Sequence, residues 1–255
     1  MTTSTTSKSK KFVTILSIVF WLVVWQLLTI VIKEEILIVS PFDVVVRLFE
    51  LMQTRVFYSS IIHSLLKIIC GFILSFITGI ILAIIAYKYK WFEILLSPLI
   101  LMMKTVPVAS FIILVLLFVH SSYLSIVISF IMVLPLIYTS VLEGIRNIDN
   151  GLKDMCDVFR LSKYKRIRFV YMSEVMPYLL SATHVSLGLC WKSGIAAEVI
   201  GTPVNSIGEK LYQAKIYFDT SDLFAWTFVI VLLSICFQKV FLVWLDRIVK
   251  KLEEV

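Results

Sequence analysis

The sequence is poor in charge, in histidine and in cysteine, and each shortage excludes a class of protein. Only 16% of its 255 residues are charged, whereas 60% are hydrophobic; this balance excludes a soluble domain and predicts a membrane protein. Three of the four cysteines lie in apolar runs and the fourth in a polar loop, so neither a disulfide framework nor a zinc site is expected. The three histidines are too scattered to form the catalytic cluster of a membrane-embedded enzyme.

The chain also lacks the Gly-rich loop, ending in Lys and then Ser or Thr, that holds the phosphates of a bound nucleotide. We therefore expect a protein that is not an enzyme and has no cofactor of its own. Its length suits one bundle of several spans without a separate soluble domain. The net charge of +7 does not require a nucleic-acid partner, because membrane topology accounts for it.

Six apolar runs are long enough to cross a bilayer, which takes about 20 residues each. They occupy residues 12–32, 68–87, 92–119, 124–142, 175–200 and 223–245. The sequence thus predicts an all-α membrane protein with six transmembrane helices in a domain of residues 12–247. Residues 1–11, rich in Thr, Ser and Lys, are expected to be a disordered cytoplasmic segment, and residues 248–255 a cytoplasmic tail.

Patterns in and between these runs predict local structure. Proline at 98 and 107 removes backbone donors from the third run, so we expect a bent or broken helix there. Gly71, Ser75 and Gly79 recur at intervals of four, which is a small-residue seam for close helix packing. Residues 41–52 are too charged to span and predict an amphipathic helix on the outer membrane surface.

The distribution of basic residues predicts the orientation. If the N-terminus is cytoplasmic, 15 of the 24 Lys and Arg residues fall on the cytoplasmic side and five on the outer side. This threefold excess places both termini in the cytoplasm.

Lys104 lies about 18 Å along the third run, close to the bilayer midplane, and three residues before the helix-breaking Pro107. A charge at that depth suggests a substrate pathway, but a lysine paired with freed carbonyls or a carboxylate explains it equally well.

The fifth run carries a second set of polar groups at helical spacing. His184, Trp191 and Glu198 share a face, and Lys192 is one residue beyond Trp191. A Trp beside a Lys on a cavity would suit an anionic ligand, although a buried Trp more often serves packing. Glu198, expected near the outer mouth, could gate, meet a delivering protein or be solvated. The candidate pathway residues are Lys104, Pro107, His184, Trp191, Lys192 and Glu198.

The polar loop of residues 143–174 holds seven of the 24 basic residues, which places it in the cytoplasm. Asp149 and Asn150 can cap a short helix whose Leu152, Met155 and Phe159 form one narrow apolar face. Ser162 can cap a second helix. Such a surface can be gripped by a soluble partner, or it can lie on anionic lipid.

This loop resembles the EAA loop of binding-protein-dependent ABC importer permeases, whose helix docks into a groove on the ATP-hydrolysing subunit. Asp154, Met155 and Cys156 match the Glu-Ala-Ala positions, and Pro177 matches the final proline. Arg160 stands where the family has a glycine, which adopts positive φ more freely. The docking residues implied by the resemblance are Leu152, Asp154, Met155, Cys156, Phe159 and Arg160.

Other stretches resemble the nitrate, taurine and alkanesulfonate importer permeases in the same order along the chain. Ser40-Pro41 is similar to a motif after their first span, and Leu187 to Gly201 is similar to their Leu-Gly-x-x-Trp and Ala-Ala-Glu-x-x-Gly run. The resemblance implies the type I (MetI-like) importer fold with a cytoplasmic coupling helix.

The same resemblance implies a homodimeric, multi-pass permease of the bacterial plasma (inner) membrane. Its partners would be an ATP-binding cassette subunit that holds ATP and Mg, an extracytoplasmic solute-binding protein and membrane lipid, and not nucleic acid. Its solute would be a small organic anion such as a sulfonate, moved by alternating access. A vitamin precursor or other nitrogenous solute, and an ATP-independent channel, remain alternatives.

Overall fold

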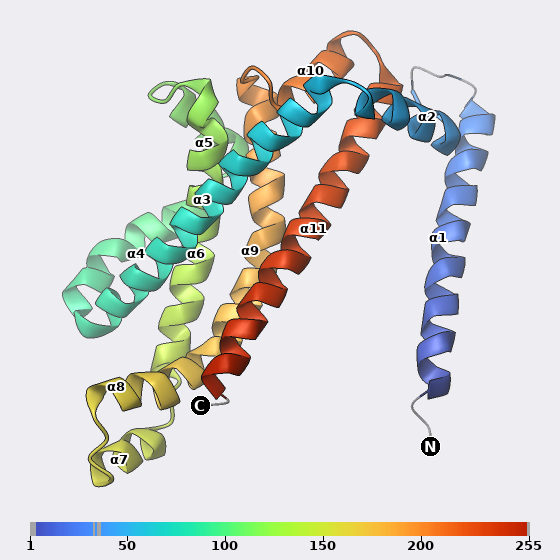
Figure 1. The fold of residues 1–255 in the computed structure, drawn as a ribbon. Coiled ribbons are helices and arrows are strands. Elements are labelled where there is room, and N and C mark those ends of the chain that lie inside the picture. The colour runs from blue at the N-terminus through green and yellow to red at the C-terminus, as the bar shows by residue number, and fades with distance from the viewer. Residues whose placement is uncertain (1–3, 33, 35–36, 254–255) are drawn as a thin grey trace. The chain divides into compact units, whose positions relative to one another are not determined.

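The computed structural model describes residues 4–32, 34 and 37–253, and every regular element among them is a helix. The described residues form two compact units, one drawn from residues 1–58 and 210–229 and the other from residues 59–209 and 230–255. Figure 1 shows the helices of both units. The all-α prediction is confirmed.

The first unit contains α1 (Ser4–Ile32), α2 (Pro41–Met52), the first turn of α3 (Arg55–Lys88), most of α10 (Ile207–Ile216) and the start of α11 (Thr220–Glu253). The expected disorder of residues 1–11 is wrong for residues 4–11, because α1 begins at Ser4. Lysine is a good helix former and lets the span continue beyond its apolar part. Residues 1–3 lie outside the described residues.

The amphipathic helix predicted for residues 41–52 is present as α2. Ser40 caps it, since its hydroxyl accepts a hydrogen bond from the Asp43 amide at 3.2 Å, and Pro41 occupies the first turn. Val44 is buried against Val39 and Ala225 in a small core. The opposite face is exposed and apolar: Phe42, Val45, Val46, Phe49 and Met52.

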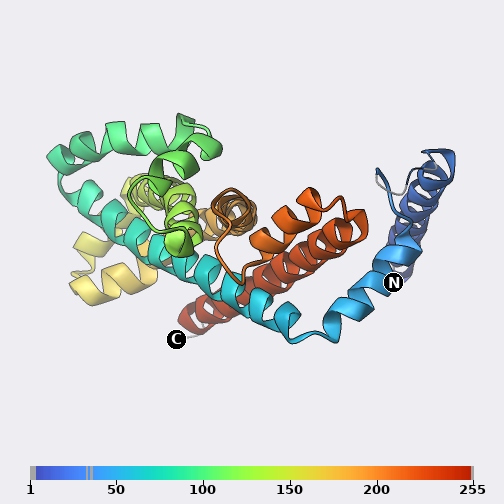
Figure 2. The same cartoon turned by 90° about the horizontal axis from the view of Figure 1, so that it is seen from above.

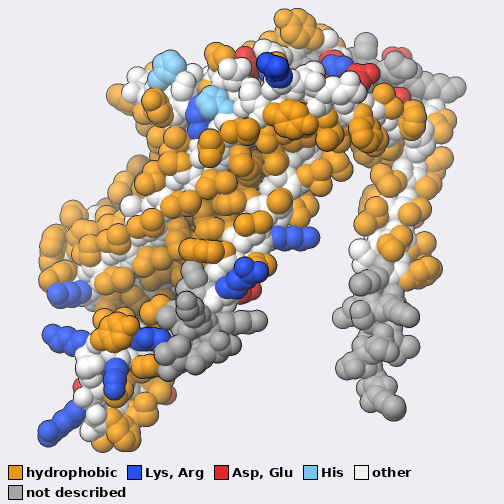
Figure 3. Space-filling view, in the orientation of Figure 1, with side chains coloured by type: hydrophobic (Ala, Val, Ile, Leu, Met, Phe, Trp, Pro, Cys, Tyr) orange, Lys and Arg blue, Asp and Glu red, His pale blue; other side chains and the backbone are white. Residues whose placement is uncertain are grey.

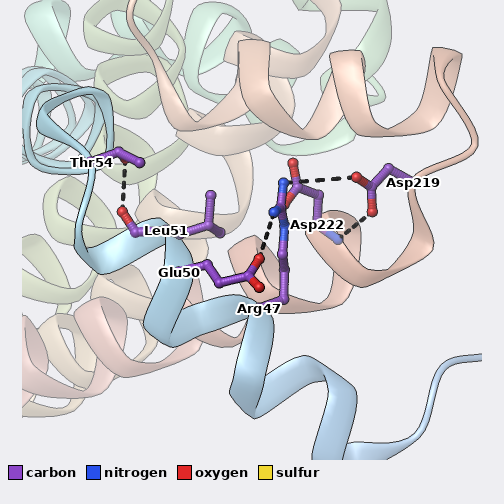
Figure 4. Close-up of polar contacts among 6 residues, drawn as sticks. All are labelled: Arg47, Glu50, Leu51, Thr54, Asp219 and Asp222. Carbon is purple, nitrogen blue, oxygen red and sulfur yellow. Dashed lines mark hydrogen bonds and ion pairs between the residues drawn. The ribbon is translucent and has the colours of Figure 1, made fainter.

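An ion-pair cluster joins α2 to the start of α11 (Figure 4). Arg47 Nε donates to Asp222 Oδ1 at 2.6 Å, and Arg47 Nη1 donates to Glu50 Oε2 at 2.8 Å. Asp219 lies at 3.9 Å from Nη2. These contacts fix the register of α2 against α11 within the first unit.

The second unit holds the rest of α3, then α4 (Lys90–Thr105), α5 (Val108–Leu116), the short 3₁₀ helix η1 (Ser121–Tyr123) and α6 (Leu124–Arg146). The polar loop of residues 143–174 forms α7 (Asn150–Val158), α8 (Lys163–Arg166) and the π-helical η2 (Ile167–Tyr171), and is followed by α9 (Met172–Gly201). Seen from above in Figure 2, α6 and α9 run side by side, and they pack extensively against each other. A core cluster of this unit joins α5, α6 and α9: Phe111, Ile112, Val115, Leu124, Ile128, Met132 and Ala197.

The two packing patterns predicted for the spans are confirmed. α4 and α5 meet at 107°, and the break falls at Val106 and Pro107, while Pro98 lies inside α4 without breaking it. The small-residue seam of α3 faces α6. A Cβ on Gly71 would lie 2.5 Å from the Ile126 carbonyl oxygen, and the Ser75 hydroxyl donates to the Phe130 carbonyl at 3.1 Å.

Among the described residues, four helices are long and apolar enough to cross a membrane, and the bent pair α4 and α5 makes a fifth candidate. The four single helices are Phe12–Ile32, Arg55–Lys88, Ser121–Arg146 and Thr220–Arg247. The remaining predicted span corresponds to α9, which is 30 residues long but carries more polar side chains. Thr183, Ser186 and Glu198 are fully buried, so their polarity faces protein rather than lipid.

Candidate functional site

The helix α7 is the first candidate, and its ends are well defined. Asp149 caps the start, because its carboxylate accepts a hydrogen bond from the Gly151 amide at 2.8 Å. At the other end the Leu161 amide bonds the Cys156 carbonyl at 3.0 Å, and the Arg160 amide bonds the Asp157 carbonyl at 3.1 Å. This pair of bonds is a Schellman motif, which normally uses glycine at the left-handed position.

Arg160 occupies that left-handed position with φ of 47°. A left-handed turn is therefore made with arginine where glycine is the usual residue, at a conformational cost of about 1 kcal/mol. The loop departs from the family motif in sequence but retains a sharp, hydrogen-bonded end to α7.

The second short helix, α8, is fastened to α7. Ser162 caps it by accepting a hydrogen bond from the Lys165 amide at 3.4 Å. Arg166 Nη2 donates to Asp157 Oδ1 at 2.5 Å and to the Lys153 carbonyl at 3.2 Å. The hydrogen bond to Asp157 raises the pKa of the Arg166 guanidinium above its ordinary value. The two helices thus form one braced hairpin.

The hairpin presents an apolar surface at its tip. Val158 is 79% exposed and Phe159 is 70% exposed, and Met155 is also exposed. Asp154 and Arg160 lie exposed beside them, whereas Leu152 is half-buried. In Figure 3, lysine and arginine side chains gather around this part of the second unit. Since exposed aromatic and aliphatic side chains are costly in water, this tip has the character of a docking surface.

Cys156 differs from the other docking residues implied by the sequence. Its side chain is only 1% exposed, so it packs inside the hairpin and is not available to a partner. Because it lies one residue beyond Met155, it falls on the inner face of the same helix. Val158, and not Cys156, is therefore a surface residue of α7.

The pathway candidates on α9 separate into exposed and buried groups. His184 and Lys192 are exposed, whereas Trp191 is 1% exposed and packs edge-on against Phe237 with ring centroids 6.3 Å apart. The idea that Trp191 lines a cavity with Lys192 is therefore wrong for the described chain. Neighbouring residues on a helix point about 100° apart, which lets one be buried and the next exposed.

Lys104 lines a cavity of about 260 Å³ between α4 and α6, whose lining also includes Glu93 and Glu143. Its ammonium donates to the Thr139 hydroxyl at 3.3 Å, and no described carboxylate lies within ion-pair distance of it. The neighbouring Glu93 instead bonds Arg146 and Lys90. A lysine held only by a hydroxyl keeps donors for a bound anion.

Glu198 is fully buried, so the alternative that it is solvated near the outer mouth is wrong. Its Oε2 accepts from the Ser64 hydroxyl at 2.6 Å and from the Gly208 amide at 3.2 Å. Ser64 also accepts from the Ile207 amide at 2.9 Å. The carboxylate thus joins α9 to α3 and to the first residues of α10.

Sequence patterns alone did not reveal this Ser64–Glu198 cluster. The available signal was the spacing of Ser60, Ser64 and Lys67, which places three polar groups along one side of a helix. This spacing does not predict a hydrogen-bonded cluster by itself, because the carboxylate that Ser64 contacts belongs to Glu198, which is 134 residues away in the sequence.

Comparison with known proteins shows the family to which the chain belongs. A model of the family described as binding-protein-dependent transport system inner membrane component matches residues 75–254. The match covers most of the chain, including the hairpin of α7 and α8 and the Glu198 cluster's α9 and α10 residues. The chain belongs to this family, and is the permease subunit of a binding-protein-dependent ABC importer in a multi-pass membrane fold of the type I (MetI-like) class.

Curated relatives carry several transport names. The chain is 26% identical over 187 residues to the bicarbonate transport system permease protein CmpB of Synechococcus elongatus, covering 73% of this chain and 67% of the relative. It is 25% identical to the putative aliphatic sulfonates transport permease protein SsuC of Bacillus subtilis, with the same coverage of 73% and 67%. It is 21% identical to the formylaminopyrimidine transport permease protein ThiX of Halalkalibacterium halodurans, covering 84% of this chain and 85% of the relative.

Proposed function

We propose that two copies of this chain form the translocation pathway of an importer for a small anion, driven by a separate ATPase that docks on α7. The observation that carries the docking step is the exposed apolar tip of a helix whose two ends are both capped. Family membership implies an ATP-binding cassette subunit and a solute-binding protein as partners.

Alternating access gives α7 its role. Closure of two ATPase subunits would draw the two α7 hairpins together, and the brace between Arg166 and Asp157 would pass that displacement toward η2 and α9. The broken α4 and α5 pair and the small residues of α9 are the elements suited to rearrange. Solute would enter from outside and leave inward after ATP hydrolysis, with both termini of the chain cytoplasmic.

The proposal for an anion rests on two features. Lys104 and the exposed Lys192 offer positive charge in or beside spans, where a charge is costly unless it has a use. Two relatives are named for the transport of bicarbonate and of aliphatic sulfonates, and both of these solutes are anions. A neutral or nitrogenous vitamin precursor is the second candidate, because one relative is named for formylaminopyrimidine transport.

Replacing Phe159 with Asp tests the docking surface. Phe159 is 70% exposed, so the change should leave membrane insertion intact. A charge in place of an aromatic anchor should remove copurification of the ATPase and reduce solute-stimulated ATP hydrolysis to the background rate. Phe118→Asp is the matched control, since Phe118 is 82% exposed on the segment after α5 and should leave ATPase copurification unchanged.

If the Phe159→Asp variant copurified with the normal amount of ATPase, the proposal that the ATPase docks on α7 would be wrong. Solute transport by the purified chain without any nucleotide would instead favour the channel alternative. Binding of a cation by the solute-binding protein would overturn the anion proposal alone.

A further inference from the structure

An apolar groove of about 380 Å³ opens between α3, α6, η2 and α9 in the second unit. Every residue that lines it is aliphatic, a methionine or a tyrosine. Its volume lies in the range of about 300–1,000 Å³ that is usual for small-molecule sites. Its walls include Ile84 and Tyr87 of α3, Ile145 of α6, Ile167 and Tyr171 of η2, and Val175 of α9.

Positive charge borders the groove at one end. Residues 163–168 contain Lys163, Lys165, Arg166 and Arg168 and no acidic residue. Ile167, which lines the groove, stands between two of these arginines, and Lys88 directly follows the lining residue Tyr87. The Nε of Arg168 is buried without a hydrogen-bond partner. A basic margin at the cytoplasmic end of transmembrane helices is the usual setting for an anionic lipid headgroup.

The chemistry of the groove favours an acyl chain over a peptide. A peptide strand or helix end would bring backbone N–H and C=O groups, and the lining offers them only two tyrosine hydroxyls. An acyl chain needs no polar partner and leaves no donor or acceptor unsatisfied in the groove. The phosphate of the same molecule would lie at the water-facing end, where the basic residues are.

We propose that this groove binds one acyl chain of an anionic phospholipid, with the phosphate held by Lys163, Lys165, Arg168 and Lys88. The bound lipid would touch η2, the π-helical segment that links the docking hairpin to α9. π-Helical turns are often found at functional sites because they add a residue without ending the helix. The lipid would therefore support the connection through which α7 acts on the spans.

Native mass spectrometry of the full chain tests this site, after equilibration with dioleoylphosphatidylglycerol or dioleoylphosphatidylcholine. The unaltered chain should retain phosphatidylglycerol in preference. Val175→Trp fills the groove and should remove most of the retention of phosphatidylglycerol, because the indole takes the space of the acyl chain. Ile84→Trp, on the exposed wall, gives a second filling variant should Val175→Trp fail to fold. Ile113→Trp on the exposed side of α5 is the matched control and should retain the lipid.

The charge contribution is tested separately. Lys165→Gln with Arg168→Gln should lower the preference for phosphatidylglycerol about 25-fold, at about fivefold for each basic residue near an anionic surface. Lys239→Gln, a single exposed lysine on α11, should change it little.

Equal retention of the two lipids by the unaltered chain would overturn the proposal. So would unchanged retention in both filling variants, or a filling variant that loses only self-association, which would mark the groove as an interface between copies. None of these measurements uses nucleotide or solute, so their failure leaves the proposed transport function standing.

Discussion

At the scale of single residues, Ser64 and Ser60 offer a direct test of the buried polar cluster. Both are fully buried on α3, but Ser64 bonds Glu198 and the Ile207 amide, whereas the Ser60 hydroxyl has no hydrogen-bond partner. Ser64→Ala would strip a bond from a buried carboxylate and orphan a buried amide. It should lower the free energy of unfolding by about 1–3 kcal/mol.

Ser60→Ala removes a hydroxyl that satisfies nothing and should be neutral or slightly stabilising. Thermal unfolding of the two variants in the same detergent measures the difference. Equal melting temperatures would mean that the Ser64–Glu198 bond is not a stabilising contact.

Lys104 is the residue on which the anion hypothesis can be tested most simply. Its ammonium bonds only the Thr139 hydroxyl among the described side chains, so its other donors face the cavity. Lys104→Gln should reduce the affinity for an anionic solute by about tenfold or more, the loss expected for a charged hydrogen bond. Lys104→Arg keeps the charge and should retain most uptake. Uptake into vesicles that contain the complete importer is the measurement, and equal uptake by both variants would assign Lys104 a structural role.

Residue-level predictions from the sequence succeeded where local geometry decides the outcome. The caps at Asp149 and Ser162 depend only on residues within three positions, and both are present. For Trp191 the packing alternative holds, and Cys156, implied as a docking residue, is buried; the sequence could not decide either, because burial depends on distant helices such as the one that carries Phe237. Helical periodicity assigns residues to faces but does not say which face another element covers.

At the scale of elements, the seam between α3 and α6 governs how closely two spans approach. A methyl group on Gly71 would lie 2.5 Å from the Ile126 carbonyl oxygen, a backbone atom that cannot turn aside. Gly71→Ala should therefore force the helices apart and cost about 1–3 kcal/mol of stability. Gly188→Ala is the matched control, because there the nearest atom is a side-chain nitrogen at 3.6 Å, which is ordinary contact. A melting temperature unchanged by Gly71→Ala would contradict this close packing.

The sequence predicts which segments are helical more accurately than it predicts where each helix begins and ends. The second apolar run appears in the sequence from residue 68, yet α3 starts at Arg55. The polar Ser60 and Ser64 interrupt the hydropathy while facing the protein interior, where hydrogen bonds satisfy Ser64. α9 begins at Met172, ahead of Pro177, so this proline lies inside the helix although it has no amide hydrogen for the bond to the fourth residue before it. Hydropathy identifies the part of a helix that suits a lipid environment, so it underestimates the length of a helix whose polar residues are buried in protein.

At the scale of the whole molecule, the orientation in the membrane follows from the same basic residues that surround the docking hairpin. Fifteen of the 24 lysines and arginines fall on the side of this hairpin under the proposed topology, and five fall on the other side. The positive-inside rule then places Ser162, which precedes α8 and η2, in the cytoplasm and Val204, which follows α9, outside; the 30-residue α9 between them is about 45 Å long. The bilayer with its headgroups is about 40–45 Å thick, so α9 is long enough to separate them.

Single cysteines at these two positions make the topology measurable. Both Ser162 and Val204 are exposed, so a membrane-impermeant maleimide can reach each from its own side. We expect Ser162→Cys to be labelled in inside-out vesicles and Val204→Cys in intact spheroplasts. Of the native cysteines, Cys156 and Cys190 are buried, while Cys70 and Cys236 lie within apolar helices, so the unaltered chain supplies the background. The reverse pattern would place α7 outside, where no ATPase could reach it, and would remove the basis of the proposed coupling while leaving the fold unchanged.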